Sequence, residues 1–332
     1  MNLRRVKAIL VARNREFLRD HGALSWNILF PVLIIIGFAF AFSSDQVEQY
    51  KVGVLQKPSD FDLAFLGTRY IRFIEMEKLK AMPKVERHQL DLLLDMENQQ
   101  YWINQSSPKG YMLERILKGS GGAEFQQQTV SGKEIRYVDW LVPGVLAMNM
   151  MFSALFGVGY VIVRYRKNGV LKRLRATPIS ALEFLTAQVI SRMWLIVVIT
   201  LVVYLGMDMI IDFNMNGSLF SLFVVFTLGA FCLISLGLVV AARIRSEEMA
   251  GGLLNMVSWP MIFLSGVWFS LEGLQPWVQK IALIFPLTHI IEASRAIMID
   301  GVGITGVMTH LIVLLVMSVC FLLLGAYSFR WE

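Results

Sequence analysis

The sequence contains only two cysteines among its 332 residues, and both Cys232 and Cys320 lie inside apolar runs. Neither a disulfide framework nor a cysteine-based metal centre can be built from this pair. Histidine is also scarce, with four residues, and His21, His88 and His310 show none of the spacings that metal ligands require. No metal site is therefore expected.

Charged residues are also few, at 17% of the chain, whereas apolar residues make up 56%. A soluble domain of this size rarely tolerates such a composition, which indicates an integral membrane protein. The net charge of +6 would suit a nucleic acid, but the basic residues lie at the edges of apolar runs and are not clustered with aromatic residues. No nucleic-acid partner is expected.

The sequence lacks a Gly-x-x-x-x-Gly-Lys-Ser/Thr motif and any strand that leads into a glycine-rich, phosphate-binding turn. The chain is therefore not expected to hydrolyse ATP, and no catalytic residue is predicted. The carboxylates of Asp139, Asp208, Asp212 and Glu272 are too scattered to form an active site at one membrane face. A polytopic membrane enzyme is thus the least favoured alternative.

Long apolar runs, by contrast, are abundant. A helix needs roughly 20 apolar residues to cross a bilayer, and six runs qualify: residues 23–43, 139–163, 188–211, 219–242, 249–269 and 307–329. The first follows a basic lead that is long for a cleaved signal peptide, so we expect an uncleaved helix. Residues 271–298 are also apolar but are interrupted by Pro276 and Pro286, which favours short re-entrant helices in the outer leaflet.

The distribution of Lys and Arg predicts the orientation. Six precede the first run, seven lie from Arg164 to Arg192, and two more lie at 243 and 245. The opposite side has only two between 270 and 306. Because loops rich in Lys and Arg stay in the cytoplasm, both termini and the loop over residues 164–188, here called the basic loop, are expected there.

Residues 43–137 have a solvent-like composition, with thirteen basic and thirteen acidic residues. Local patterns predict a strand at 50–56, a helix at 109–119 and a hairpin that turns at Ser131-Gly132. The predicted fold class is a polytopic α-helical membrane protein with six transmembrane helices and re-entrant outer helices. A small α/β extracytoplasmic domain is expected between spans one and two.

The basic loop predicts two helices. In the first, residues 165–176, Val170, Leu171 and Leu174 share one side, which is typical of a helix at the membrane surface. Thr177 suits an N-cap and Pro178 the first helical position, so a second helix is expected from Pro178 to Ile211. Its 34 residues would extend roughly 51 Å, beyond the bilayer core, and could transmit a push into the membrane. The alternative is that the basic residues only anchor the loop.

Three segments of the chain resemble the membrane subunit of an ABC type-2 exporter. They are "GVLKRLRATPISALEFLTAQ" at 169–188, "LSGVWFSLEGLQPWVQKIALIFPLTHIIEASRAI" at 264–297 and "VDWLVPGVLAMNMMF" at 138–152. Members share a Gly-x-Leu-x-x-Leu-x-x-Thr-Pro pattern in the first cytoplasmic loop and Ser-Gly, Pro-Trp and Pro-Leu-Thr before the last span. The chain departs from the family where Asn168 replaces an acidic residue, and where Val170 and Lys172 replace the more common Thr and Glu.

This resemblance implies a permease in the bacterial inner membrane that acts with a second permease chain, as a homodimer or heterodimer. A cytoplasmic ATPase subunit would carry ATP and Mg. The first loop helix would dock on that ATPase, and residues 1–22 would form an amphipathic interfacial helix along the same surface. The implied coupling residues are Gly169, Leu171, Arg173, Leu174, Arg175, Thr177 and Pro178. A drug-like or lipid-like compound is the favoured substrate, and mechanical work on a periplasmic partner without substrate flux is the alternative.

A transport pathway is expected at the interface of the two permease chains, because six spans are few to enclose one. Polar and small residues within spans are its candidate lining, since polar groups in hydrocarbon need partners. These are Asn149, Ser153, Gly157, Gly251, Gly252, Asn255 and Ser258. Packing of helices through small residues is the alternative at each position.

One more group of ionisable residues follows Pro286. His289, Glu292 and Arg295 have near-helical spacing and are predicted to pair at the outer membrane interface. A proton relay is the alternative, because ionisable groups at membrane depth are often functional.

Overall fold

The computed structural model describes residues 3–41, 50–55, 63–132, 135–271, 275–329 and 331. Residues 1–2 of the predicted interfacial helix, residues 42–43 of the predicted first span and Glu272 lie outside this description. The chain divides into two compact units. One, the helical unit, comprises Met1–Phe40 and Val138–Glu332, and the other, the inserted domain, comprises Ala41–Tyr137.

The inserted domain is built on a five-stranded sheet in the order β2-β1-β3-β4-β5. Its strands are β1 (Tyr50–Val54), β2 (Ile71–Glu75), β3 (Leu92–Asp95), β4 (Gln100–Asn104) and β5 (Gln126–Val130). Only the β3–β4 pair is antiparallel among the four pairings. The domain also contains η1 (Ala64–Gly67), α3 (Lys78–Glu86) and α4 (Pro108–Gly119). The strand and the helix predicted from local patterns lie at β1 and α4.

The hairpin predicted at Ser131-Gly132 is wrong. β5 ends at Val130 and pairs in parallel with β4, and no strand follows it among the described residues before the next helix. A parallel pair needs a crossover, which α4 provides between β4 and β5. The local turn residues therefore end an edge strand instead of reversing the chain onto a neighbour.

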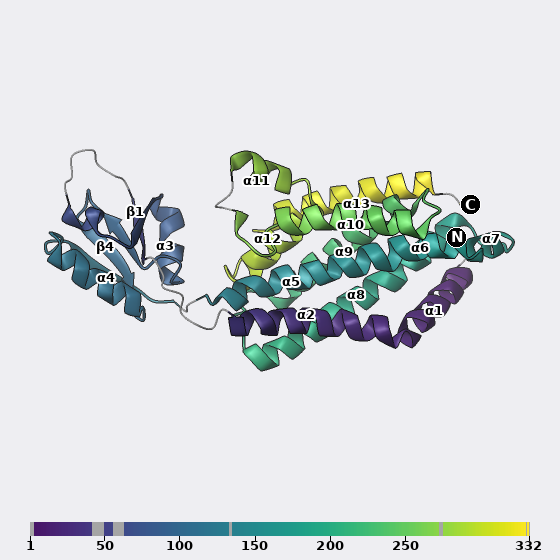
Figure 1. The fold of residues 1–332 in the computed structure, drawn as a ribbon, viewed down its shortest axis with the longest axis horizontal. Helices are drawn as coiled ribbons and strands as arrows, with labels where there is room; N and C mark the ends of the chain where they lie inside the picture. The colour runs from purple at the N-terminus through teal and green to yellow at the C-terminus, as the bar shows by residue number, and fades with distance from the viewer. Residues whose placement is uncertain are drawn as a thin grey trace. The chain divides into compact units, whose positions relative to one another are not determined.

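Both faces of the sheet are buried at the central strands β3 and β4, where successive side chains point to opposite faces and enter separate cores. In β3, Leu92 and Leu94 join the core with Leu113 and Leu117 of α4, whereas Leu93 joins the core with α3. Figure 1 shows α3 and α4 on opposite sides of the sheet. The inserted domain thus has its own two-sided core.

The helical unit is formed by long helices joined by short turns (Figure 1). These are α1 (Leu3–Arg19), α2 (His21–Ala41), α5 (Tyr137–Ala154), the π-helical turn η2 (Leu155–Tyr160), α6 (Val161–Lys167), α7 (Val170–Arg175), α8 (Ala181–Ile211), α9 (Leu219–Ala241), α10 (Glu247–Leu264), α11 (Pro276–Ala282), α12 (Pro286–Met298) and α13 (Met308–Ser328). Figure 1 shows α1, α7 and the C-terminal end of α13 at the same end of this unit.

Four helices of the described chain are long and apolar enough to cross a membrane: Tyr137–Lys167, α8, α9 and α13. A fifth span results if α11 and α12, which are bent by 98°, count as one broken span. The bend equally fits the predicted re-entrant helices. The helical unit is therefore that of a polytopic membrane protein, whereas the count of six spans, which includes α2 and α10, stays a prediction.

The centre of the unit is α9, which packs against α13, η2, α12 and α8. Its contacts with η2 and α13 are close because small residues meet there. A Cβ atom on Gly159 would lie 3.1 Å from the carbonyl oxygen of Gly237, and one on Gly325 would lie 3.1 Å from Cβ of Leu238. Close backbone approach through small residues is the usual packing mode of helices in lipid.

The helix predicted over 165–176 is interrupted. The membrane helix that begins at Tyr137 continues to Lys167, and Gly169 then adopts a left-handed conformation with φ of +68°. Glycine reaches this conformation without a steric penalty and often ends helices. The Asn168-Gly169 pair therefore separates the membrane helix from the short α7.

The predicted start of the next helix at Pro178 is also wrong. Ser180 is the N-cap of α8, and its hydroxyl accepts the backbone N–H of Glu183 while the Glu183 carboxylate accepts the backbone N–H of Ser180. Thr177 instead donates its hydroxyl to the Leu174 carbonyl at 2.6 Å. Thr177 has a serine three residues later, so it lacks the glutamate that completes such a reciprocal capping box.

Candidate functional site

The N-terminal helix α1 packs along α8 through a narrow buried face made by Val6, Arg13 and Phe17. Two side chains of α8, Ser191 and Trp194, donate hydrogen bonds to the Asn14 amide oxygen of α1. At the other end of α1, Arg5 donates to the Pro178 carbonyl in the basic loop. α1 is therefore attached both to a membrane helix and to the basic loop.

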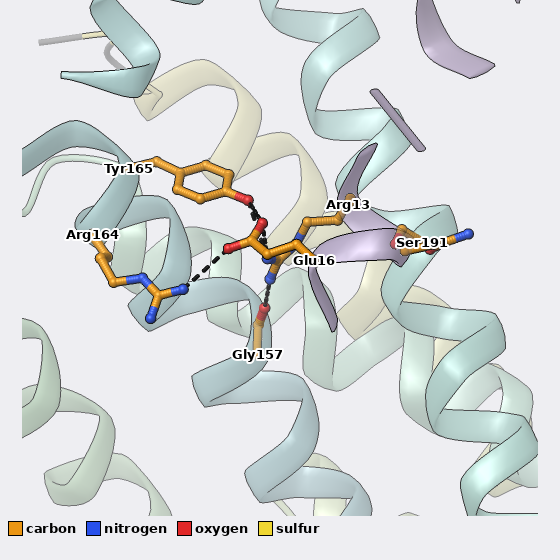
Figure 2. A network of polar contacts seen from close by, with 7 residues as sticks. Arg13, Glu16, Gly157, Arg164, Tyr165 and Ser191 are labelled. Carbon is orange, nitrogen blue, oxygen red and sulfur yellow. Dashed lines mark hydrogen bonds and ion pairs between the residues drawn. The ribbon is translucent and has the colours of Figure 1, made fainter. Parts of the chain in front are cut away.

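A polar network joins α1 to η2 and α6 (Figure 2). Arg13 donates to the Glu16 carboxylate at 2.9 Å, to the Tyr165 hydroxyl at 3.2 Å and to the Gly157 carbonyl at 2.9 Å. Tyr165 donates to Glu16, and Arg164 forms an ion pair with Glu16 at 3.2 Å. One carboxylate thus holds two guanidinium groups and a phenol.

Arg192 is the most unusual residue of this region. It lies within the apolar helix α8 and is only 7% exposed. Its Nε donates to the Ser153 carbonyl and its Nη2 to the Ser153 hydroxyl, both at 2.8 Å, and its guanidinium lies over the ring of Phe17. Arg192, the last of the seven cations counted from Arg164 for the predicted orientation, is thus buried in α8 and lies beyond the basic loop. An arginine inside an apolar run is a candidate functional residue.

A cavity of about 490 Å³ lies between α1, α2, the α5–η2–α6 helix and α8. Three predicted pathway residues line it, namely Asn149, Ser153 and Gly157. Asn149 donates to the Asn27 carbonyl of α2 at 3.0 Å. The complete lining is Arg13, Glu16, Phe17, Asp20, Asn27, Phe30, Asn149, Phe152, Ser153, Phe156, Gly157, Val161, Arg164 and Arg192.

The other four predicted pathway residues lie on α10, away from this cavity. No atom lies within 4 Å of a Cβ placed on Gly251 or Gly252, and Asn255 is exposed and donates to the Gly251 carbonyl at 2.9 Å. Ser258 is buried and donates to the Leu254 carbonyl. The first three thus mark an open face of α10, whereas Ser258 belongs to the packed interior.

The predicted pairing of His289, Glu292 and Arg295 after Pro286 stays a prediction, and the structure adds contacts to it. His289 and His310 approach through their Nδ1 atoms at 3.1 Å, and His310 lies 3.8 Å from the Glu292 carboxylate. Arg295 donates to the carbonyls of Trp140 and Gly266, with its guanidinium 3.5 Å from the centre of the Trp140 ring. His310 on α13 is the member that sequence spacing could not associate with this group.

The predicted coupling residues are divided between a buried anchor and an exposed surface. Leu171 is fully buried and Leu174 is partly buried, which confirms the predicted apolar side of the loop helix. The exposed members are Arg173, Arg175, Thr177 and Pro178, and Gly169 is partly buried at the turn. The basic loop is therefore anchored by the buried Leu171, and its arginine side chains are exposed.

The helix that leads into the basic loop, η2 and α6, contacts α9 and α10. Arg166 donates to the carbonyls of Ala241 and Ala242 at the end of α9, where a cation also complements the helix dipole. At the start of α10, Glu247 accepts the Tyr160 hydroxyl at 2.7 Å and lies 3.7 Å from Lys167.

The neighbouring carboxylate, Glu248, accepts a hydrogen bond from the Ser246 hydroxyl and lies 3.6 Å from Lys167. The bond from Ser246, the backbone and Lys167 lower the pKa of Glu248 from its usual value. Ion pairs of Lys167 with Glu247 and Glu248 thus connect the start of α10 to α6, the helix that leads into the basic loop.

The helical unit and its basic loop define a multi-pass membrane protein with a charged surface suited to a partner. The family model described as ABC-2 type transporter matches residues 88–299, more than half of the chain. The chain belongs to this family. It is a multi-pass inner membrane permease subunit of an ABC transporter.

Named relatives agree with this membership. The probable multidrug ABC transporter permease YbhS of Escherichia coli (strain K12) is 22% identical, over 99% of this chain and 95% of the relative. ABC transporter G family member 20 of Dictyostelium discoideum is 25% identical over 79% of this chain and 36% of its own length. The inner membrane transport permease YhhJ of Escherichia coli is 26% identical, over 56% of this chain and 51% of the relative.

Proposed function

We propose that this permease is one of two membrane chains of an ATP-driven exporter that moves a hydrophobic or amphiphilic compound out of the cytoplasm or the inner leaflet. A separate cytoplasmic ATPase subunit would bind ATP and Mg. Both termini and the basic loop would face the cytoplasm, and the inserted domain would lie on the opposite side of the membrane.

The observation that carries this proposal is the direct connection of the basic loop to a long membrane helix. α8 begins with a closed capping box at Ser180 and continues for 31 residues, or about 46 Å. This exceeds the roughly 30 Å of the hydrocarbon core, so the first turns of α8 stand outside it. A displacement of the basic loop by an ATPase would therefore reach the membrane through an unbroken helix.

The substrate class rests on the surroundings of the pathway and on the relatives. The membrane helices are largely apolar, and the printed name of YbhS describes a probable multidrug permease. The second permease chain would face the open side of α10, where a Cβ added to Gly251 or Gly252 would meet no atom of another element within 4 Å and Asn255 is exposed. Small residues allow a second helix to approach closely.

The experiment is ATP hydrolysis by membranes that contain this chain with its ATPase from the same genome. The double variant Arg173→Glu/Arg175→Glu reverses two exposed charges without altering the buried Leu171. We expect co-purification and substrate-stimulated hydrolysis to fall at least tenfold, because an ATPase surface complementary to the basic loop would then meet like charges, which strongly disfavour association. Arg243→Glu, in the exposed turn after α9, is the matched control and should retain both.

The two variants separate the proposal from its alternative. If the basic loop only anchors topology, both variants should behave alike and both should retain the ATPase. A second candidate function is mechanical work on a periplasmic partner, which the complete core of the inserted domain favours. Vesicles that hydrolyse ATP and bind that partner without accumulating any compound would support this second function.

A further inference from the structure

The cavity beside α1 contains a buried cation, Arg192, for which the described residues supply no ionic partner. The contacts that the structure describes for Arg192 are with the Ser153 carbonyl, the Ser153 hydroxyl and the face of Phe17, all of which are uncharged. Burying an unpaired guanidinium costs several kcal/mol. Such a residue persists in a membrane helix where it serves a function.

A second guanidinium lines the same cavity. Arg13 is only 8% exposed, and its one acidic contact, Glu16, is shared with Arg164. The lining as a whole contains three arginines against two carboxylates, Glu16 and Asp20, of which Asp20 is exposed. The cavity therefore has an excess of positive charge.

The position of Arg192 along α8 corresponds to the level of lipid headgroups. Arg192 follows Ala181 by eleven residues, or about 16 Å, and precedes Ile211 by nineteen, or about 29 Å. The second length equals the thickness of the hydrocarbon core. If α8 ends at one boundary of the core, Arg192 lies at the other.

The lining combines the polar residues Asn27, Asn149 and Ser153 with five apolar side chains. Phe17, Phe30, Phe152, Phe156 and Val161 face it beside the arginines. Its volume of about 490 Å³ falls within the range of about 300–1,000 Å³ of small-molecule sites, which combine apolar walls with a few placed polar groups. The lining thus suits a molecule with a charged end and an apolar end.

We propose that this cavity binds the anionic headgroup of an amphiphile, with a phosphate or carboxylate held by Arg192 and Arg13. The occupant comes either from the bilayer, as an anionic phospholipid, or from solution, as an anionic amphiphile. Binding does not depend on the proposed transport reaction. An occupant would contact α1, α8 and η2 at once. It would thus link the lipid or amphiphile to α1 and α8, the two helices that contact the basic loop.

The test is binding of dodecyl phosphate to the purified full-length chain in a neutral detergent, followed by the shift in Tm. We expect a saturable increase in Tm that uncharged dodecyl maltoside does not produce. Arg192→Gln should weaken the affinity roughly tenfold or more, since it removes a charge-assisted hydrogen bond. Arg192→Lys should retain part of the affinity, and Arg15→Gln, on the exposed side of α1, should retain all of it.

A second variant keeps the test decisive if Arg192→Gln fails to fold. Ser153→Asp places a carboxylate beside the guanidinium, so the fold keeps a partner for Arg192 while the anion site is neutralised. We expect a folded chain with no response to dodecyl phosphate. A response equal to that of the wild type in either variant would overturn the proposal.

Competition experiments in nanodiscs distinguish a bilayer lipid from an amphiphile that enters from solution. If phosphatidylglycerol, but not phosphatidylcholine, competes with dodecyl phosphate, the occupant is a bilayer lipid. If binding depends on Arg192 and neither lipid competes, the occupant is an amphiphile from solution. An effect that is independent of Arg192 in both membranes would overturn the proposal, whatever the transport assay of the complex shows.

Discussion

A Cβ atom on Gly157 would lie 2.1 Å from the guanidinium carbon of Arg192. The Arg192 side chain of α8 therefore fills the space that a side chain at position 157 of η2 would need. The same glycine presents its carbonyl to Arg13. The π-helical turn around Gly157, a feature often found at functional sites, therefore contacts both cavity arginines.

Gly157→Ala should destabilise the helical unit. The added methyl group must displace the Arg192 guanidinium from a closely packed site, which costs about 1–3 kcal/mol. Thermal unfolding in detergent should show a lower Tm, and Arg192→Ala in the same chain should restore part of it. Gly206→Ala is the control, because a Cβ there meets no atom within 4 Å, and it should be neutral or slightly stabilising. A Tm unchanged by Gly157→Ala would contradict the described packing.

Glu16→Gln should loosen α1 from the helical unit. The substitution removes the carboxylate shared by Arg13, Arg164 and Tyr165, and hydrogen bonds to a charged group are worth about 1.5–3 kcal/mol. Hydrogen exchange of amides in α1 should accelerate more than that of amides in α9. Arg19→Gln, at the exposed end of α1, should leave exchange unchanged. Equal exchange in the two variants would show that the network does not hold α1.

Ser180→Ala should fray the start of α8. Loss of an N-cap costs about 0.5–2 kcal/mol, and here the reciprocal bond from the residue 180 backbone N–H to the Glu183 carboxylate weakens as well. Faster hydrogen exchange of the amides at Glu183 and Phe184 is the expected result. Thr177→Ala is the matched variant, and it should leave these amides protected because Thr177 bonds backwards to Leu174. The opposite ranking would place the helix start at Thr177-Pro178 after all.

The inserted domain should lose stability at alkaline pH. Burial and the bond to Glu114 raise the pKa of Tyr101, and the hydrogen bond to Glu114 raises the pKa of Lys118. Groups whose pKa is raised by folding stabilise fully below their unfolded values, about 10 for tyrosine and lysine, and lose that contribution as the pH rises through the folded values. Stability should therefore fall above about pH 10.

The measurement is hydrogen exchange or unfolding of the inserted domain within the full chain between pH 8 and about pH 11, corrected for intrinsic exchange. Tyr101→Phe should reduce the alkaline slope. Tyr111→Phe, which alters a tyrosine that is 52% exposed, should leave the slope unchanged. An identical slope in all three proteins would exclude the Tyr101 contribution.

Local signals predicted several features well. Apolar run length located the membrane helices that begin at Tyr137, Ala181, Leu219 and Met308, and helical spacing identified Leu171 as the buried side of the loop. The helix start predicted at Thr177-Pro178 was wrong, because Ser180 is a cap residue of the same kind that also has Glu183 three residues later to complete the capping box. The hairpin at Ser131-Gly132 was wrong because strand pairing depends on distant strands.

The sequence by itself determined the class of protein, four of its membrane helices, its basic loop and its family, because composition, run length and short motifs are properties of neighbouring residues. Only the tertiary structure decided the site beside α1. Arg13 meets Gly157 across 144 positions, and Arg192 meets Ser153 across 39. Such contacts follow from how whole helices pack, so no local pattern reveals that two cations counted toward the cytoplasmic surface lie buried around a shared cavity.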